Sequence, residues 1–145
     1  MIDATDILAA RILVVDDDVD SASMLSQALV LNGYSAVTTT SDPHAVHDLH
    51  RINDYDLILL DVQMPGMDGF VVMEGLKEFE RDGYLPVLAL TGEPGHRNRA
   101  LKLGARDFLC KPVEIDELLL RVRNMVEVRL LYKEREPAPS GTTRL

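Results

Sequence analysis

Leu57-Ile58-Leu59-Leu60-Asp61 is the most informative segment of the chain for its fold. Four consecutive apolar residues run directly into a carboxylate, and residues 62–69 follow with the glycine, proline and aspartate content of a loop. A short apolar run bounded by turn residues indicates a strand that is buried on both faces. Asp61 is therefore predicted at the carboxyl end of a central strand, the edge at which open α/β sheets bind ligands.

The composition is that of one globular domain. The chain has 145 residues, of which 46% are hydrophobic and 27% charged, values that exclude a disordered chain. A net charge of −9 argues against a nucleic-acid-binding face and against an anionic membrane surface. The N-terminus is acidic where a signal peptide is basic, no apolar run approaches a membrane span, and a single cysteine excludes an internal disulfide. We therefore expect a soluble cytoplasmic protein.

Apolar, β-branched runs alternate with amphipathic segments five times along the chain. Strands are predicted over residues 11–15, 34–40, 57–61, 86–90 and 107–110. A helix is predicted after each strand, over residues 20–31, 43–51, 69–81, 94–103 and 114–136. Asp20 or Ser21 is the expected N-cap of the first helix. In the second helix, Asp42 supplies the N-cap and Pro43 the first helical residue.

Short strand–helix units with apolar strands predict a parallel sheet that helices cover on both faces. With right-handed crossovers, five such units favour the flavodoxin-like (βα)5 sandwich, an α/β fold with strand order 2-1-3-4-5. We divide the chain into a lead-in (1–10), one folded domain (11–130), and a helix extension with a flexible tail or linker (131–145). This strand order brings Asp16 and Asp17 next to Asp61.

Polar residues stand at the ends of four predicted strands: Asp16 and Asp17, then Asp61, Thr91 and Lys111. Carboxylates a few Å apart repel one another in a partly buried site. Mg²⁺ relieves such repulsion and prefers a few carboxylates together with waters and phosphate oxygens. A lysine and a hydroxyl on the other side complete a phosphate site. Asp61 lies between the two halves, so it is the expected nucleophile and would form an aspartyl phosphate.

Each of these residues has a simpler interpretation when it is taken alone. An aspartate after a strand commonly caps a helix, a strand-end threonine commonly bonds to backbone, and a single lysine is commonly a surface charge. Only their convergence favours the phosphate site. For two other candidates the simpler interpretation is preferred. We expect His44, His47 and His50 on a solvated helix face rather than in a zinc site, and Cys110 as a small buried hydrophobe.

The chain resembles the receiver domain of a two-component response regulator, of the chemotaxis-regulator type. The matching segments are residues 12–18, 59–69, 88–92 and 111–112, and they occur in the order of the family's motifs. The resemblance covers about residues 11–130. It implies that a sensor histidine kinase or phosphotransfer protein donates a phosphoryl group to Asp61, and that the reaction requires Mg²⁺, with Mn²⁺ as the alternative ion.

The resemblance also implies roles for residues near the acceptor. Asp17 and Asp61 correspond to direct metal ligands, with the backbone carbonyl of Gln63 as a third. Asp16 corresponds to an acid that acts mostly through bound water. Gln63 and Glu93 take the positions that screen or orient the hydrolytic water, so they are expected to tune the lifetime of the phosphate.

Three further positions correspond to the family's switch. Thr91 resembles the hydroxyl that turns toward the phosphate, and Lys111 resembles the lysine that pairs with it. The Lys111-Pro112 bond is expected to be cis, which a bond before proline allows at low cost. Phe108 takes the aromatic switch position but lacks the hydroxyl of a tyrosine.

The last predicted helix is longer than a compact domain requires. Its apolar residues are expected to cover the sheet and continue beyond it: Leu118, Leu119, Val122, Met125, Val126, Leu130 and Leu131. Two interpretations stay open. The helix is either partly solvated and stabilised by i,i+4 charge pairs, or a signalling helix that pairs with another protomer or leads to an output domain. A homodimer would use residues 94–103, 107–110 and the helix from Glu114.

The expected function is a phosphorylation-controlled switch and not a turnover enzyme. The domain would catalyse its own phosphorylation and slow dephosphorylation, and Thr91 and Phe108 would rearrange to control an output domain or effector protein. One alternative is a phosphohydrolase of the haloacid-dehalogenase type, which needs a second acid where Gln63 stands. Another is a receiver-like module that binds partners without phosphorylation, which the intact set of site residues disfavours.

Overall fold

A computed structural model of the chain describes residues 1–63, 69–81 and 84–135. Within them, five parallel strands form one sheet in the order β2-β1-β3-β4-β5, as predicted. The strands are β1 (Arg11–Val15), β2 (Ala36–Thr40), β3 (Leu57–Asp61), β4 (Val87–Thr91) and β5 (Asp107–Cys110). The α-helices are α1 (Ala4–Leu8), α2 (Val19–Leu31), α3 (Val46–Asn53), α4 (Gly69–Arg81), α5 (Arg97–Lys102) and α6 (Ile115–Arg135). Single 3-10 turns, Pro43–Ala45 and Pro94–His96, precede α3 and α5.

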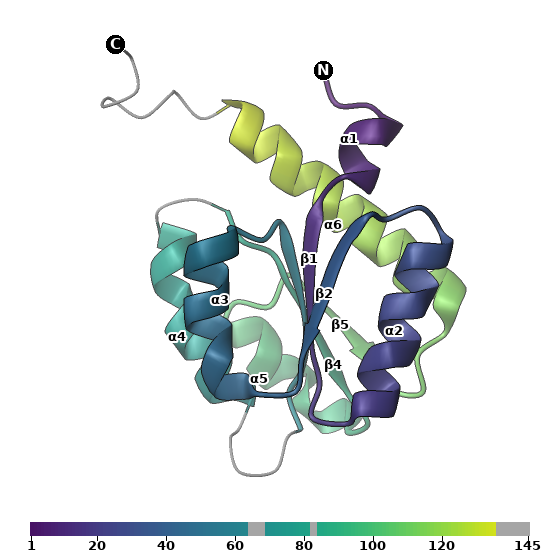
Figure 1. Ribbon diagram of the computed structural model, residues 1–145. Helices are drawn as coiled ribbons and strands as arrows, with labels where there is room; N and C mark the ends of the chain where they lie inside the picture. Colours follow the sequence, from purple (N-terminus) through teal and green to yellow (C-terminus); the bar gives the residue numbers. More distant parts are fainter. Residues whose placement is uncertain (64–68, 82–83, 136–145) are drawn as a thin grey trace.

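Helices cover both faces of the sheet. Figure 1 shows α2 and α6 on one face and α3, α4 and α5 on the other. Alternate residues of each inner strand belong to separate cores: Val14 and Leu59 face α2 and α6, whereas Val15 and Leu60 face α3 and α4. Both faces of the sheet are thereby buried at its centre, which explains why β1, β3 and β4 are apolar runs rather than alternating ones.

Strand β3 lies at the centre of the sheet, between β1 and β4, and residues 57–60 are fully buried. Its pairing with β1 sets the geometry of the candidate site. Val15 is opposite Leu60, so the next residue of each strand, Asp16 and Asp61, leaves the sheet beside the other. The convergence predicted from the sequence therefore follows from one register.

Several local predictions are wrong. The N-cap of α2 is Asp18 rather than Asp20 or Ser21, because the Asp18 carboxylate accepts the backbone N–H groups of both those residues. Cys110 is exposed, because β5 is an edge strand with a neighbour on one side only. His50 is buried, because α3 packs against α4 and the Nδ1 of His50 accepts the backbone N–H of Tyr55.

Some expected features fall on residues that the structure does not describe. They are the cap at Asp68, the helix end at Asp82-Gly83 and the tail after Arg135.

The lead-in contains α1, whose Ile7 is buried in the core beneath α2 and α6. No helix among the described residues combines the length and apolar character needed to cross a membrane.

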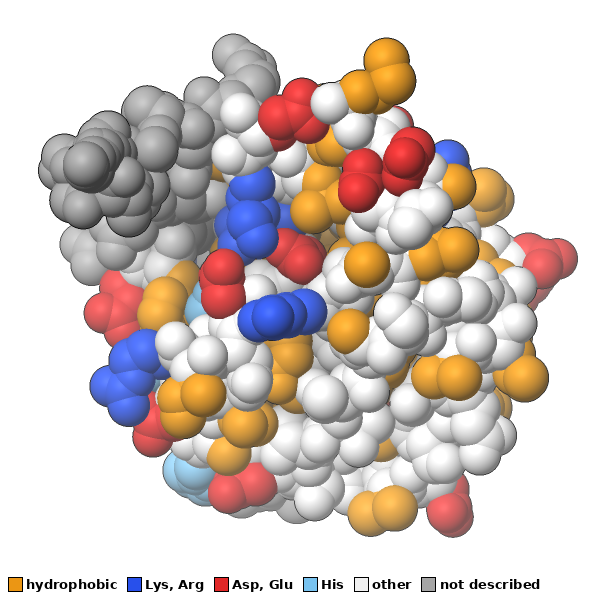
Figure 2. Space-filling model, turned by 45° about the horizontal axis from the view of Figure 1, so that its top comes forward, with side chains coloured by type: hydrophobic (Ala, Val, Ile, Leu, Met, Phe, Trp, Pro, Cys, Tyr) orange, Lys and Arg blue, Asp and Glu red, His pale blue; other side chains and the backbone are white. Residues whose placement is uncertain are grey.

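A buried charge attaches helix α6 to the amino end of β3, the end of the strand opposite Asp61. Arg129 is 7% exposed, and its guanidinium donates to Asp56 at 3.5 Å, to Asp54 at 3.3 Å and to the backbone carbonyl of Tyr84. Lys133 adds a second cation, 3.1 Å from Asp56 Oδ1. Figure 2, which tilts this end of the molecule forward, shows basic and acidic side chains next to one another near the centre of the view. Arg129 and Lys133 therefore connect the C-terminal part of α6 to the segment just before β3.

Candidate functional site

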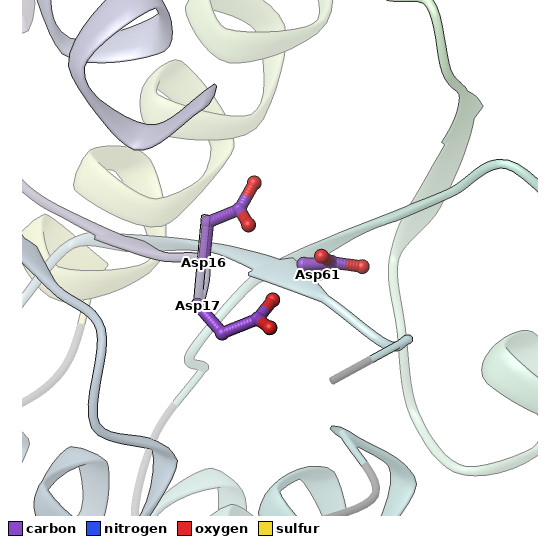
Figure 3. A group of neighbouring side chains, drawn as sticks. All are labelled: Asp16, Asp17 and Asp61. Atoms are coloured by element: carbon purple, nitrogen blue, oxygen red, sulfur yellow. The ribbon is translucent and has the colours of Figure 1, made fainter. Parts of the chain in front are cut away.

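Three carboxylates meet at the carboxyl ends of β1 and β3. Asp16, Asp17 and Asp61 each offer an oxygen atom within 4.8 Å of the others, and Figure 3 shows the three side chains gathered where the two strands end. Asp16 and Asp61 are buried, and Asp17 is the most accessible of the three. The sequence prediction that these residues converge is confirmed.

Lys111 joins two of these carboxylates from the end of β5. Its Nζ donates to Asp16 Oδ2 at 2.9 Å and to Asp61 Oδ2 at 3.2 Å, and it lies 3.5 Å from Ser21 Oγ. The Lys111-Pro112 bond is cis, as expected. The single positive charge of the ammonium group is shared by two of the three carboxylates, so the chain itself neutralises only part of the cluster.

The pKa directions of this group follow from burial and from the shared lysine. Burial acts to raise the pKa of Asp16, but hydrogen bonds from Lys111 and from the Asp18 N–H outweigh it and hold this pKa below its ordinary value. For Asp61 burial prevails over the hydrogen bond from the Gln63 N–H, so its pKa is raised. Burial lowers the pKa of Lys111, but the two carboxylates more than compensate and raise it.

This cluster fits a hard divalent cation. It supplies carboxylate oxygens from Asp16, Asp17 and Asp61, the ligands that suit Mg²⁺ or Mn²⁺, whereas imidazole and thiolate ligands would favour zinc or copper. Three acids with one lysine also leave an excess of negative charge, which a cation would offset. The residues present therefore fit a magnesium site.

On the other side of Asp61, the switch candidates form a separate set of hydrogen bonds. Thr91 is fully buried at the end of β4, and its Oγ1 donates to Gln63 Oε1 at 2.6 Å. The backbone N–H of Gly92 donates to the same oxygen at 2.8 Å. The backbone N–H of Gln63 in turn donates to Asp61 Oδ1 at 2.9 Å. Gln63 thus links the central carboxylate to the end of β4.

Residues 12–123 match the family model described as the response regulator receiver domain. The chain belongs to this family. It is 39% identical over 137 residues to the response regulator PleD of Caulobacter vibrioides, and the match covers 92% of the chain and 30% of PleD. It is also 39% identical to the transcriptional regulatory protein TcrA of Mycobacterium tuberculosis, and that match covers 78% of the chain and 44% of TcrA. The receiver domain thus spans less than half of either relative.

Solved receiver structures share this fold. A putative response regulator from Chloroflexus aurantiacus superimposes with a TM-score of 0.75 at 31% identity, covering 82% of this chain and 98% of that one. The chemotaxis response regulator CheY4 of Vibrio cholerae gives a TM-score of 0.73 at 29% identity, with 81% and 98% covered. These similarities identify the chain as the receiver domain of a response regulator.

The remaining predicted site residues of the receiver domain lie further from the carboxylates. Phe108 is half-buried on β5, where it packs against the core beneath α4 and α5. The Glu93 side chain is exposed, and it is the backbone N–H of Glu93 that contacts Thr91 Oγ1, at 3.1 Å. Sequence reasoning missed His96, whose Nδ1 is 3.3 Å from Thr91 Oγ1. The turn at residues 94–96 brings it there, and no spacing rule for strands or helices reveals such a contact.

Proposed function

We propose that Asp61 is the phosphoacceptor of this receiver domain. The observation that carries the proposal is its position: a buried carboxylate at the end of the central strand, with two acids on one side and a lysine 3.2 Å from its Oδ2. Among the three acids, Asp61 alone also lies beside the hydrogen bonds that lead to Thr91. A phosphoryl group on Asp61 could therefore contact both the acids with Lys111 and the hydrogen-bonding groups near Thr91.

In the proposed reaction a carboxylate oxygen of Asp61 attacks the phosphorus of a phosphohistidine on a sensor kinase or phosphotransfer protein. The P–O bond forms as the P–N bond breaks, and the departing imidazole takes up a proton. Lys111 and the backbone N–H groups at the strand ends would hold the phosphoryl oxygens. The domain would thereby promote its own phosphorylation, and slow hydrolysis of the acyl phosphate would reset it.

Mg²⁺ is the proposed cofactor, with Mn²⁺ as a substitute. Asp16, Asp17, Asp61 and the backbone carbonyl of Gln63 would hold it, and the bound ion would neutralise charge on the transferring phosphoryl group. Asp16 already shares Lys111 with Asp61. We therefore assign Asp16 the role of fixing the lysine and the hydration of the ion.

The proposed output is a local change of charge that alters a protein surface. Thr91 and Phe108 would rearrange when the phosphoryl group arrives, and they are connected to the face formed by α5, β5 and α6. An output domain, an effector protein or a second copy of the chain would bind there. Residues 11–130 would form the receiver and residues 131–145 a helix extension with a tail or linker, in a protein of the cytoplasm.

The test is incubation with a small phosphodonor and Mg²⁺, followed by intact mass measurement. We expect the wild type to gain the mass of one phosphoryl group and Asp61→Asn to gain none. Asp48→Asn, which changes an exposed acid on α3, is the matched control and should behave like the wild type. Absence of a mass gain in the wild type, or a gain that persists in Asp61→Asn, would refute the assignment.

A further inference from the structure

The side chain of Gln63 lies where a ligand of the switch residues would be expected. Its Oε1 accepts two hydrogen bonds at once, from Thr91 Oγ1 at 2.6 Å and from the backbone N–H of Gly92 at 2.8 Å. Two donors that converge on one oxygen at such distances form the arrangement that binds an oxyanion. In this structure the oxygen that they hold belongs to an uncharged carboxamide of the same chain.

Thr91 has no hydrogen-bonding capacity left for a second acceptor. A hydroxyl has one proton to donate and accepts with its lone pairs. Its proton goes to Gln63, and it accepts the backbone N–H of Glu93 at 3.1 Å. The contact of 3.3 Å with His96 Nδ1 is compatible with this only if the imidazole donates there. The single N–H of Gly92 is likewise engaged with Gln63.

Gln63 is also close enough to Asp61 for a change at the Asp61 carboxylate to affect the hydrogen bonds of the Gln63 side chain. It follows Asp61 by two residues, and its backbone N–H donates to Asp61 Oδ1 at 2.9 Å. One residue therefore contacts the proposed phosphoacceptor with its backbone and the switch threonine with its side chain. Gln63 is otherwise exposed, so its side chain can leave for water at little cost.

We propose that the Gln63 carboxamide is an internal latch, which occupies the Thr91 and Gly92 donors until a phosphoryl oxygen displaces it. This inference rests on the proposed function, since it assumes that Asp61 carries the phosphoryl group. The latch holds Thr91 in place in the unmodified domain. A phosphoryl oxygen accepts charge-assisted hydrogen bonds, which are stronger than those made by an amide oxygen. It therefore replaces Gln63 Oε1 as the acceptor of both donors, and the glutamine side chain moves into solvent.

The latch differs from a role of Gln63 in placing water for hydrolysis. A latch acts before the phosphoryl group arrives, so it weakens binding of any ligand that needs the same two donors. A residue that only orients hydrolytic water changes the lifetime of the acyl phosphate and leaves that binding unchanged. Beryllofluoride, a stable mimic of the phosphoryl group, separates the two because it is bound but not hydrolysed.

The decisive variant is Gln63→Met, which keeps the length of the side chain and replaces the amide by a thioether, a weak acceptor. In Mg²⁺ buffer we expect it to bind beryllofluoride about fivefold more tightly than the wild type, which corresponds to about 1 kcal/mol. Gln27→Met makes the same chemical change on the exposed side of α2. This control should bind the mimic as the wild type does.

A second readout reports the hydrogen bond itself. In nuclear magnetic resonance spectra of the domain without phosphodonor, the Gly92 amide proton should shift upfield in Gln63→Met, because it loses its acceptor. Adding beryllofluoride to the wild type should replace the Gln63 oxygen as the acceptor of the Gly92 amide. The Gln27→Met spectrum should be unchanged at Gly92.

The outcomes distinguish the latch from the function on which it rests. Equal or weaker binding of beryllofluoride by Gln63→Met would overturn the latch while leaving Asp61 as the acceptor. An unchanged Gly92 amide shift in this variant would overturn it as well. If the wild type neither binds the mimic nor gains phosphoryl mass, the proposed function fails and the competition fails with it, even where the Gly92 shift confirms the hydrogen bond.

Discussion

Replacing Lys111 by methionine should separate metal binding from phosphoryl transfer. Lys111 Nζ lies 2.9 Å from Asp16 Oδ2 and 3.2 Å from Asp61 Oδ2, so it neutralises the carboxylates that would bind the cation. It is also the cationic donor nearest to the position of a phosphoryl group on Asp61. Lys111→Met removes the charge and keeps the length of the side chain. We therefore expect the Mg²⁺ affinity to rise and the rate of phosphorylation to fall.

The magnitudes follow from the charges that the lysine brings together. Two unit charges about 4 Å apart interact by about 1 kcal/mol in water and by about 4 kcal/mol at an effective dielectric constant of about 20. Loss of the ammonium group removes its repulsion of a divalent ion by about 1–2 kcal/mol, so Mg²⁺ should bind about tenfold more tightly. Loss of a donor to the transferring group should slow phosphorylation by about 10²- to 10³-fold.

Both quantities can be measured on the same preparation. Calorimetric titration gives the Mg²⁺ affinity, and intact mass against time gives the rate of phosphorylation by a small donor at saturating Mg²⁺. Lys77→Met on α4 is the matched control, because Lys77 is 45% exposed and pairs only with Glu74 among the ion pairs of the described residues. Weaker Mg²⁺ binding in Lys111→Met, or phosphorylation within threefold of the wild-type rate, would refute the reasoning.

Two further substitutions and one pH dependence test the packing that supports the site. Arg129→Met should lower the free energy of unfolding by about 3 kcal/mol, because among the described residues it leaves the half-exposed Lys133 as the one cation beside the buried Asp56 carboxylate; urea unfolding followed by circular dichroism measures this. Burial lowers the pKa of His50, against the opposing effect of nearby carboxylates. Because this pKa is depressed in the folded state, the neutral His50 contributes its full stability above the unfolded pKa of 6.5. That contribution is lost as the pH falls below 6.5, so unfolding at about pH 5 should need less urea than at about pH 7. Gly69→Ala should destabilise the domain by about 2 kcal/mol, because a Cβ there would lie 2.5 Å from Val62 Cα, and thermal unfolding would report it.

Each of these three predictions has a matched control. Arg121→Met removes a half-exposed arginine paired with Asp107 and should cost less than about 1 kcal/mol; an equal loss in both arginine variants would contradict the buried-charge argument. His50→Asn can still accept the Tyr55 N–H and should show a weaker pH dependence, whereas an unchanged dependence would exclude His50 as its source. Gly75→Ala, on the same helix as Gly69 with nothing within 4 Å of the added Cβ, should be neutral or stabilising.

The fold and the main site were predictable because they depend on features that are local in the sequence. The apolar run at residues 57–60 indicates a strand buried on both faces, and Gly, Pro and Asp after it mark where that strand ends. Five such units leave few topologies, and parallel strands place all their carboxyl ends at one edge. Asp16, Asp61 and Lys111 were therefore brought together by topology alone, although Asp16 and Lys111 are 95 positions apart in the chain.

The errors at His50 and Cys110 share a physical cause, since both concern which side of an element meets a neighbour. The spacing of His50 is compatible with an exposed position, and its burial is decided by the packing of α3 against α4. Cys110 has the apolar surroundings of a buried strand in the sequence, but it lies on the edge strand and is exposed. Arg129 carries no signal of its burial, because its partners Asp54 and Asp56 come from a different element.

The order of the strands, the acids that meet at their ends and the family of the domain could all be inferred from the amino-acid sequence. Periodicity and turn residues specify these features without reference to distant contacts. Only the tertiary structure decided that the Gln63 side chain holds Thr91 and Gly92, and that Lys111 bridges Asp16 and Asp61. Hydrogen bonds depend on distances of a few tenths of an Å between side chains from separate elements, and such distances are set by packing of the whole domain.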